Sequence, residues 1–411
     1  MPNAAPGTTA DRACLVLGGA THSTLGAVRS IARLGIPTFV ATIDRRAVPV
    51  FAASRACAGV RRVAAGNPGE LAGELLDFAR AELPWAAHVL VISTSERVID
   101  HLDAGRDRLD PRFELAIPPA AVCRALLDKA QSLPLAEQAG LQVPPWACVA
   151  SVADIEALPR FGFPVCVRPT AWDTVGAHFF KIAICETPEA LRSCLLAAVA
   201  DGGTFIVQEY KGDADGLDVG MVWVAPDGSD VRTWTGRKRR SSSPEGGVLA
   251  WGEARALPDV EAGVRAFAAS IGYRGIGGIE FLRSGDDLWF IEFNPRLEAF
   301  HRLGAISGFD APALLAGAWI GREPGPPERS SRAAMWVGEA WSQRATHDRR
   351  GPALLVGDGA RFLSHRRRVC SLWSFRDPGP ALASARAALS RRARQGAASV
   401  RGRFRRARPA D

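Results

Sequence analysis

The first 119 residues alternate apolar, strand-like runs with segments of helical periodicity, and no other feature of the sequence restricts the fold as strongly. Strands are expected at residues 14–17, 37–43 and 88–93, with helices at 24–34 and around 70–81. Parallel strands need long crossover connections, so this β-α-β-α-β order predicts a parallel sheet with helices on its faces. We therefore expect an α/β domain over residues 13–119, after a disordered segment over 1–12.

Three glycines lie where the first strand passes into the first helix. Gly18, Gly19 and Gly26 occur there, and Asp44 follows the second strand. A dinucleotide site would use such residues, but the G-x-G-x-x-G spacing is not met because six residues separate Gly19 from Gly26. We favour a tight strand-to-helix turn, and a nicotinamide-dependent oxidoreductase stays as an alternative.

Residues 120–322 follow a different order. Strands in hairpins mix with flanking helices there, which is typical of α+β architecture. Helices are expected at 121–139, 152–158, 188–200 and 258–271, and strands at 163–168, 179–185, 204–209, 217–224, 231–236 and 248–254. We therefore expect a second domain of a different class from the first.

Residues 278–296 contain a hairpin that carries several polar side chains. A Ser-Gly-Asp-Asp turn at 284–287 separates two strands. Glu292 and Asn294 are two residues apart and share one face, whereas Ile291 and Phe293 point to the other. Folding at the turn brings Glu280 opposite or diagonal to Glu292, with Cβ atoms roughly 4.5–7 Å apart. The three polar side chains are therefore expected to converge.

Two neighbouring carboxylates repel each other unless a cation lies between them. Oxygen ligands from Glu280, Glu292 and Asn294 suit Mg²⁺, which usually takes one or two carboxylates together with phosphate oxygens and water. Arg296 follows as a candidate for stabilising a phosphate or an acyl phosphate. The alternative is the solvated polar face of an amphipathic hairpin.

Lysine is rare in this chain and supplies only four of the 51 basic residues. In a chain that otherwise uses arginine, a lysine is a candidate for a site that needs a compact point charge. The residues before the lysines exclude a P-loop and the Val-Ala-x-Lys strand of a protein kinase. The four are Lys129, Lys181, Lys211 and Lys238.

The net charge of +8 is concentrated after residue 365. Thirteen arginines against two aspartates give residues 366–411 a charge of +11, so the preceding 365 residues carry −3. The globular part therefore gives no indication of a nucleic-acid partner. Residues 381–394 could form a short helix with arginines on one face, able to touch anionic lipid or a polyanion. A solvated disordered or helical segment is the alternative.

The eight cysteines are scattered without a C-x-x-C pair, and the seven histidines do not approach them at zinc-ligand spacing. Buried free thiols in a reducing cytosol are therefore expected. The N-terminal residues lack the charged and apolar regions of a signal peptide, and no apolar run is long enough to span a membrane. These features predict a cytoplasmic protein.

Several motifs occur in order between residues 121 and 321. They are Leu127-Asp-Lys129, Val165-Cys-Val-Arg168-Pro, Lys181 after a polar loop, Val207-Gln208-Glu209-Tyr210-Lys211-Gly, Thr235-Gly-Arg-Lys238-Arg-Arg240, Ile279-Glu280-Phe and Ile291-Glu292-Phe-Asn294-Pro-Arg296. Their order and spacing resemble the ATP-grasp superfamily. They are most similar to carboxylate-amine ligases such as D-aspartate ligase and to the synthetase halves of carbamoyl phosphate synthase.

The resemblance implies a nucleotide site. Three basic residues would contact the phosphates, namely Lys129, Arg168 and Lys181. Arginine at 168 stands in place of the usual lysine, and the loop over 170–178 has only Gly176 where many members have several glycines. The adenine hinge would consist of Gln208, Glu209, Tyr210 and Lys211, with Asp213 or Asp215 at the ribose.

The resemblance also implies a metal site and a catalytic group. Glu280, Glu292 and Asn294 would bind Mg²⁺ or Mn²⁺. Lys238, Arg240 and Arg296 would hold the substrate carboxylate and the developing oxyanion. The domain over 120–322 would then be a two-lobed ATP-grasp domain, preceded by a pre-ATP-grasp domain and followed by an extension over 323–411.

The implied activity is an ATP-dependent, ADP-forming ligase with ATP and Mg²⁺ as cofactors. A small carboxylic acid would be activated as an acyl phosphate and transferred to an amine or a similar nucleophile. An ATP-binding protein without ligase activity is a further alternative. Glu298 and His301 could line the acceptor pocket, or they could be a helix-start acid and a surface histidine. Asp310 is expected to cap a helix.

Overall fold

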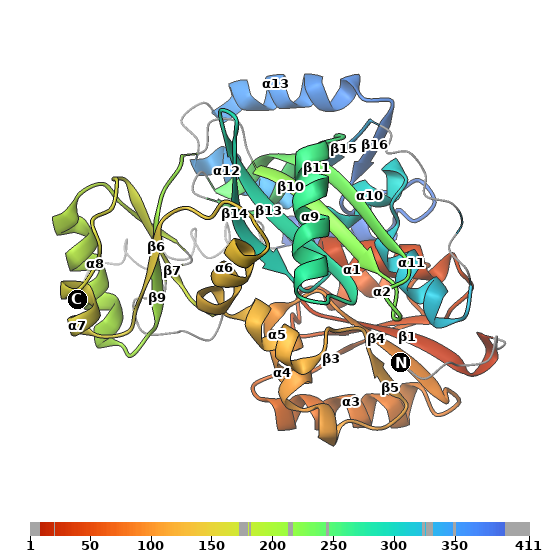
Figure 1. The fold of residues 1–411 in the computed structure, drawn as a ribbon. Helices are drawn as coiled ribbons and strands as arrows, with labels where there is room; N and C mark the ends of the chain where they lie inside the picture. Colours follow the sequence, from red (N-terminus) through yellow and green to blue (C-terminus); the bar gives the residue numbers. More distant parts are fainter. Residues whose placement is uncertain are drawn as a thin grey trace, which may run out of the picture.

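The computed structural model describes residues 9–19, 21–171, 180, 182–212, 217–243, 246–322, 325, 332–347 and 351–390. Lys181, Asp213, Asp215, most of the loop over 170–178 and the arginine-rich residues 391–411 lie outside these ranges. Within the ranges the chain forms three sheets with helices around them (Figure 1). No helix in this part of the chain is long and apolar enough to cross a membrane.

The N-terminal sheet, at the bottom of Figure 1, is parallel as predicted. Its strands are β1 (Arg12–Leu17), β2 (Thr38–Thr42), β3 (Gly59–Arg62), β4 (His88–Ser93) and β5 (Phe113–Leu115), in the order β3-β2-β1-β4-β5. Its helices are α1 (Thr21–Ala32), α2 (Val48–Ala52), α3 (Pro68–Glu82) and α4 (Glu96–Ala104), with 3-10 turns at Thr9–Asp11 and Arg106–Arg108. Every residue of β1 and β2 is buried, which explains the continuous apolar runs over 13–17 and 39–41.

Packing accounts for the glycines at the first turn. Gly18 has a φ of 153°, and a Cβ there would lie 2.2 Å from Thr94 Oγ1. A Cβ on Gly26 would lie 2.7 Å from Cε1 of His301, the first residue of α10 (His301–Ser307). The tight-turn interpretation thus explains Gly18. Gly26 allows α1 to pack directly against α10.

The central sheet is mostly antiparallel, and only β15 and β16 pair in parallel. Its strands are β10 (Leu217–Val224), β11 (Val231–Ser243), β12 (Gly246–Ala254), β13 (Gly275–Ser284), β14 (Asp287–Asn294), β15 (Ala333–Trp336) and β16 (Arg367–Cys370), in the order β14-β13-β10-β11-β12-β15-β16. Helix α9 (Pro258–Ser270) crosses one face (Figure 1). Because β15 and β16 come from residues after 322, the predicted extension continues the sheet of the predicted ATP-grasp domain.

The hairpin of β13 and β14 contains a bulge that the alternation did not predict. Glu280 pairs with Glu292, but its neighbour Phe281 pairs with Phe290, so Ile291 is the extra residue. The expectation that Ile291 shares the core face with Phe293 was therefore wrong. Phe290 takes that place and lies fully buried against Phe267 and Phe281.

A third, smaller sheet lies at the left of Figure 1 and is antiparallel. Its strands are β6 (Trp146–Val149), β7 (Val165–Pro169), β8 (Ala183–Cys185) and β9 (Phe205–Glu209), in the order β6-β9-β7-β8, with α7 (Val152–Glu156) and α8 (Pro188–Ala200). The single helix expected over 121–139 was wrong. Asp128 is extended and its side chain caps the second of two helices, α5 (Ala120–Leu127) and α6 (Lys129–Gln138).

The remaining helices are α11 (Ala311–Trp319), α12 (Gly338–His347), α13 (Gly351–Ser364) and a helix over 379–390. Asp310 caps α11 as predicted, accepting from Ala313 N–H. All eight cysteines lie in the described ranges and are free thiols; Cys148 is exposed.

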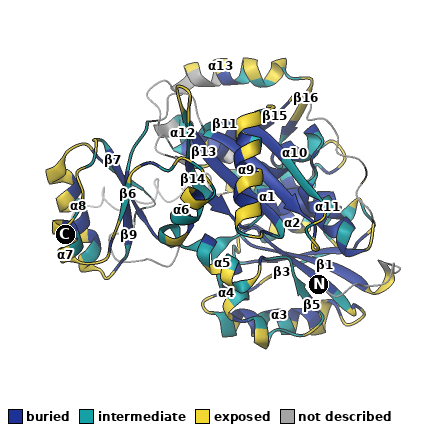
Figure 2. Cartoon of the chain, in the orientation of Figure 1, coloured by how far each residue is buried: buried dark blue, intermediate teal, exposed yellow. Residues whose placement is uncertain are grey.

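One hydrophobic core joins the N-terminal domain to the central sheet. It contains Leu25 and Val28 of α1 together with Trp223 and Trp251 of the sheet. Figure 2 shows this buried interior continuing from α1 into the central strands. The boundary between the parallel sheet and the central sheet is therefore closely packed, and polar groups buried there are held in fixed positions.

Candidate functional site

The predicted metal hairpin brings its polar side chains together. Glu280 and Glu292 are direct register partners on β13 and β14. Asn294 Nδ2 donates to Glu292 Oε1 over 3.2 Å, so the amide lies beside the carboxylate. Glu280 and Asn294 are buried. The convergence expected from the sequence is confirmed, and the two carboxylates need a positive charge nearby.

Lys238 supplies such a charge. Its Nζ donates to both oxygens of Glu280, over 2.9 and 3.2 Å, and the two side chains are 5% and 9% exposed. Lys238 comes from β11, which is separated from β13 by β10. The lysine therefore reaches across one strand to form a buried, charge-assisted pair.

Arg296 connects this group to the N-terminal domain. Its Nη2 donates to Asn294 Oδ1 over 3.2 Å and to Glu96 Oε1 over 2.7 Å. Its Nη1 lies 2.8 Å from Glu298 Oε1. Burial opposes its charge, but the carboxylates of Glu298 and Glu96 outweigh burial and raise the pKa of Arg296. Because Glu96 is the first residue of α4, one guanidinium joins two domains.

Three more titratable side chains belong to this region: Glu298 and His22 interact with Arg296, and His301 interacts with His22. Burial raises the pKa of Glu298 to about 7 against the opposing charge of Arg296, with Glu280 and Glu292 adding to the rise. Burial also lowers the pKa of both His22 and His301 to about 4. His301 Nε2 lies 2.8 Å from the carbonyl oxygen of Ser23. His301 is buried, so the surface-histidine alternative is wrong, whereas Glu298 lies just before α10, as the helix-start alternative expected.

The predicted phosphate-binding residues of the described chain lie around the end of β7. Arg168 Nη2 donates to Gln208 Oε1 over 2.8 Å. Arg168 Nε and Gln208 Nε2 are buried without a hydrogen-bond partner among the described residues. The backbone N–H of Lys129 donates to the Thr170 carbonyl, which places the start of α6 beside this strand end. Buried donors without partners at a strand end are suited to an anionic ligand.

The hinge stretch is held by contacts within the protein. Glu209 accepts from Lys211 Nζ over 2.6 Å and from Gly162 N–H over 2.8 Å, and these bonds lower its pKa. Lys211 Nζ also lies 4.8 Å from the centre of the Trp289 ring. The N–H groups of Glu209 and Tyr210 donate to proline carbonyls. A purine at this hinge would therefore have to use other backbone atoms.

Arg240 does not join the Glu280 group. The register shifts between Lys238 and Arg240, and Arg240 Nε lies 3.3 Å from Asp358 Oδ2 on α13. Asp358 is buried, so this pair ties β11 to α13. Its catalytic role stays a prediction without support from this geometry.

The donor set fits a hard divalent cation. Two carboxylates and an amide lie together, and Mg²⁺ usually completes its shell with phosphate oxygens and water. No group of three His, Cys, Asp or Glu side chains in the described ranges is suited to a metal, so phosphate oxygens would be needed here. Glu280 would have to share its oxygens between the cation and Lys238.

Sequence reasoning missed the residues that the N-terminal domain contributes. Glu96 and His22 belong to no motif. Each precedes Arg296 by 200 residues or more in the sequence. The ion pair between Arg296 and Glu96 of α4, together with the packing of α1 against α10, brings them close. The one sequence signal for this contact was Gly26, because the absence of a side chain there leaves room for His301.

Comparison with known proteins gives distant relatives, and no family model matches the chain. The carbamoyl phosphate synthase large chain of Streptomyces avermitilis is 26% identical over 190 residues, covering 44% of this chain and 16% of that protein. The formate-dependent phosphoribosylglycinamide formyltransferase of Burkholderia pseudomallei is 24% identical over 241 residues, covering 51% and 58%. The chain thus spans less than two thirds of either relative.

Solved structures share the fold over most of the chain. N5-carboxyaminoimidazole ribonucleotide synthetase from Thermus thermophilus has a TM-score of 0.59 at 20% identity, covering 78% of this chain and 82% of that one. L-amino acid ligase from Bacillus licheniformis has a TM-score of 0.56 at 14% identity, covering 78% and 76%. The biotin carboxylase domain of Hydrogenobacter thermophilus 2-oxoglutarate carboxylase, in complex with MgADP, has a TM-score of 0.58 at 18% identity, covering 77% and 71%.

These relatives and structures are ATP-grasp ligases, so the resemblance predicted from the motifs is confirmed. The fold is that of these enzymes. Neither the domain boundaries nor the roles of single residues are tested by this likeness, and they stay predictions.

Proposed function

We propose that this chain is an ATP-dependent ligase that activates a carboxylate as an acyl phosphate and transfers the acyl group to an amine or a similar nucleophile. The observation that carries the proposal is the connected group of Lys238, Glu280, Glu292, Asn294 and Arg296. It joins two cross-strand carboxylates to two cations at a domain boundary. Such a group is suited to holding phosphate and carboxylate together.

The reaction would proceed in two displacements. A carboxylate oxygen attacks the γ-phosphorus of ATP, the bond to the β-phosphate oxygen breaks, and ADP leaves. The nucleophile then attacks the acyl carbon, the bond to the phosphate oxygen breaks, and inorganic phosphate leaves while the amine loses a proton. The substrates would be a small carboxylic acid and an amine.

We assign each basic residue a role from its position in the structure or in the sequence motifs. Lys129 and Arg168 would bind the nucleotide phosphates, because Arg168 has a buried donor without a partner among the described residues. Lys238 and Arg296 would hold the carboxylate and the oxyanion that develops on it. Lys181 and Asp215 would complete the nucleotide site from positions outside the described ranges.

Glu280, Glu292 and Asn294 would hold Mg²⁺, which when bound would offset the negative charge of the phosphates. The acceptor would lie where the N-terminal domain meets the hairpin. Arg296 and Glu298 from one side and Glu96 from the other offer both signs of charge at this place.

Hydroxylamine trapping tests the proposal without knowledge of the natural amine. The full chain is incubated with ATP, Mg²⁺, hydroxylamine and a panel of amino acids and other small acids, and hydroxamate and ADP are measured. We expect equal amounts of both with at least one acid, and neither with the Glu292→Ala variant. Tight ATP binding without hydroxamate from any acid would favour an ATP-binding protein without ligase activity. Binding of NAD(P)H in place of ATP would favour the oxidoreductase alternative.

A further inference from the structure

Residues 371–390 expose four large apolar side chains. Phe375 is 90% exposed, Leu389 66%, Leu382 50% and Trp373 42%. Trp373 and Phe375 contact each other edge to face, with ring centroids 5.7 Å apart. Single exposed apolar residues are ordinary, but four large ones within seventeen positions form the kind of exposed apolar surface that marks an interaction site. We call these four side chains the apolar surface.

The helix over 379–390 turns its apolar stripe outward. Leu382, Ala385 and Leu389 are exposed at the i, i+3 and i+7 spacing of one helix face, and Arg386 is exposed beside them at i+4. A helix of a globular domain normally points such a stripe at the core. In this helix the apolar stripe instead points away from the described part of the chain.

The base of this segment is firmly anchored, so its exposure does not reflect loose packing. Asp377 accepts from Arg29 Nε over 2.8 Å, from Ser54 Oγ over 2.7 Å and from Arg55 N–H over 3.0 Å. A Cβ on Gly379 would lie 2.0 Å from the Ala53 carbonyl oxygen, which shows how closely the chain approaches α2. The apolar surface thus extends from a fixed platform on the N-terminal domain.

The charge of the following sequence indicates the chemistry of the partner. Residues 391–411 contain eight arginines and one aspartate. Arg376 and Arg386 are exposed within the segment itself. Apolar and aromatic side chains next to many arginines suit the interface of a bilayer with anionic headgroups. A second copy would bring like charges together, and a nucleic acid would use the arginines but not the leucines.

We propose that residues 371–390 dock the protein on an anionic lipid bilayer, to which the arginine-rich sequence that follows adds positive charge. Trp373, Phe375, Leu382 and Leu389 enter the headgroup region, and Arg376 and Arg386 bind the lipid phosphates and carboxylates. This inference does not depend on the proposed ligase activity.

Co-sedimentation with vesicles tests the proposal. The full chain is mixed with phosphatidylserine–phosphatidylcholine vesicles and with phosphatidylcholine vesicles, at low and at physiological salt. We expect binding to the anionic vesicles only, weakened by salt because the charges are screened. A double substitution Phe375→Ser and Leu389→Ser should weaken binding at least tenfold, equivalent to about 1.4 kcal/mol. A variant ending at Ser390 should weaken it by a similar factor or more.

The matched control is Leu363→Ser on α13, a helix whose exposed side is visible in Figure 2. Leu363 is 64% exposed, almost the same as Leu389, but lies outside the apolar surface. Circular dichroism confirms that each variant is folded. The proposal is overturned if anionic vesicles are not bound, or if the control weakens binding as much as the double substitution. It is also overturned if the protein is a dimer that the double substitution dissociates. The same holds if the protein binds duplex DNA tightly and the double substitution leaves that binding unchanged.

Discussion

Replacing Lys238 by methionine tests the buried pair at the centre of the candidate site. In the structure Lys238 Nζ contacts both oxygens of Glu280, and both side chains are almost fully enclosed. Methionine keeps most of the volume but removes the charge, so Glu280 is left buried beside Glu292 without a cation. Removing one partner of a buried pair typically costs about 3–5 kcal/mol.

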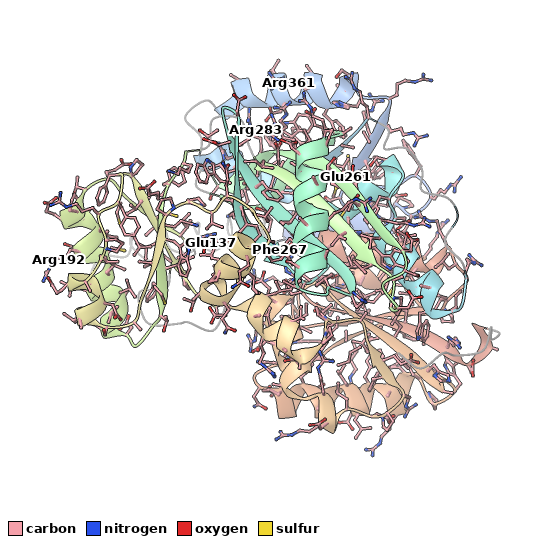
Figure 3. The ribbon with its side chains drawn as sticks, in the orientation of Figure 1. Glu137, Arg192, Glu261, Phe267, Arg283 and Arg361 are labelled. Carbon is pink, nitrogen blue, oxygen red and sulfur yellow. The ribbon has the colours of Figure 1, made fainter. Side chains whose placement is uncertain are left out.

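We therefore expect Lys238→Met to lower the free energy of unfolding by about 3–5 kcal/mol in a urea titration with EDTA present. The double variant Lys238→Met, Glu280→Gln should recover most of this loss, because no buried charge is left unpaired. The matched control is Arg192→Ala. Arg192 pairs with Glu156 over 2.7 Å, but the two side chains are 56% and 60% exposed, as the outward position of Arg192 in Figure 3 shows. Its loss should be no more than about 1 kcal/mol.

Adding Mg²⁺ to Lys238→Met extends the test to the metal. If Glu280 and Glu292 attract the cation, Mg²⁺ at a hundredfold excess over its dissociation constant should restore about 2.7 kcal/mol of stability. ATP turnover should stay lost, because the proposed carboxylate-binding charge is absent. The reasoning about the buried pair would be refuted if, in EDTA, Lys238→Met lowered the free energy of unfolding by no more than Arg192→Ala does.

Three further predictions concern the domain boundary. The pKa of Glu298 is raised to about 7, so ionisation of this carboxyl destabilises the folded chain. The free energy of unfolding should therefore fall by up to about 3 kcal/mol as the pH rises from 4.5 to above 7. Urea titrations of the Glu298→Gln variant over the same pH range should not show this fall. Gly26→Ala should lower stability by about 1–3 kcal/mol through overpacking against His301, whereas an unchanged urea midpoint would show that α1 and α10 can separate at no cost. Glu96→Gln should lower kcat roughly tenfold or more while the KM for ATP changes little, because Arg296 loses its orienting partner; a changed KM with an unchanged kcat would contradict this role.

The elements with strong periodicity could be predicted from the sequence. The parallel order of the first sheet follows from its alternating strands and helices, and the pairing of Glu280 with Glu292 follows from the turn at 284–287. The bulge at Ile291 could not be predicted, because residues 288–291 are all apolar, so the pattern does not show which of them faces the core, and tertiary packing selects Phe290. The break at Asp128 is similar, since a capping aspartate inside a helical pattern gives only a weak local signal.

The candidate site divides in the same way. Its hairpin residues lie close in sequence, so their spacing on a strand determines their geometry. Glu96, His22 and Asp358 reach their partners through contacts between distant elements, and no local pattern encodes such contacts. Arg240 shows the converse, because a register shift on β11 separates it from Lys238 although the two are only two residues apart.

Transfer of a labelled oxygen tests the central claim most directly. A carboxylic acid that supports ADP formation is supplied with ¹⁸O in its carboxylate, and the released phosphate and nucleotide are analysed by mass spectrometry. If the carboxylate attacks the γ-phosphorus, each phosphate released should carry one ¹⁸O and the nucleotide none. Unlabelled phosphate, or label in AMP, would contradict the acyl-phosphate mechanism.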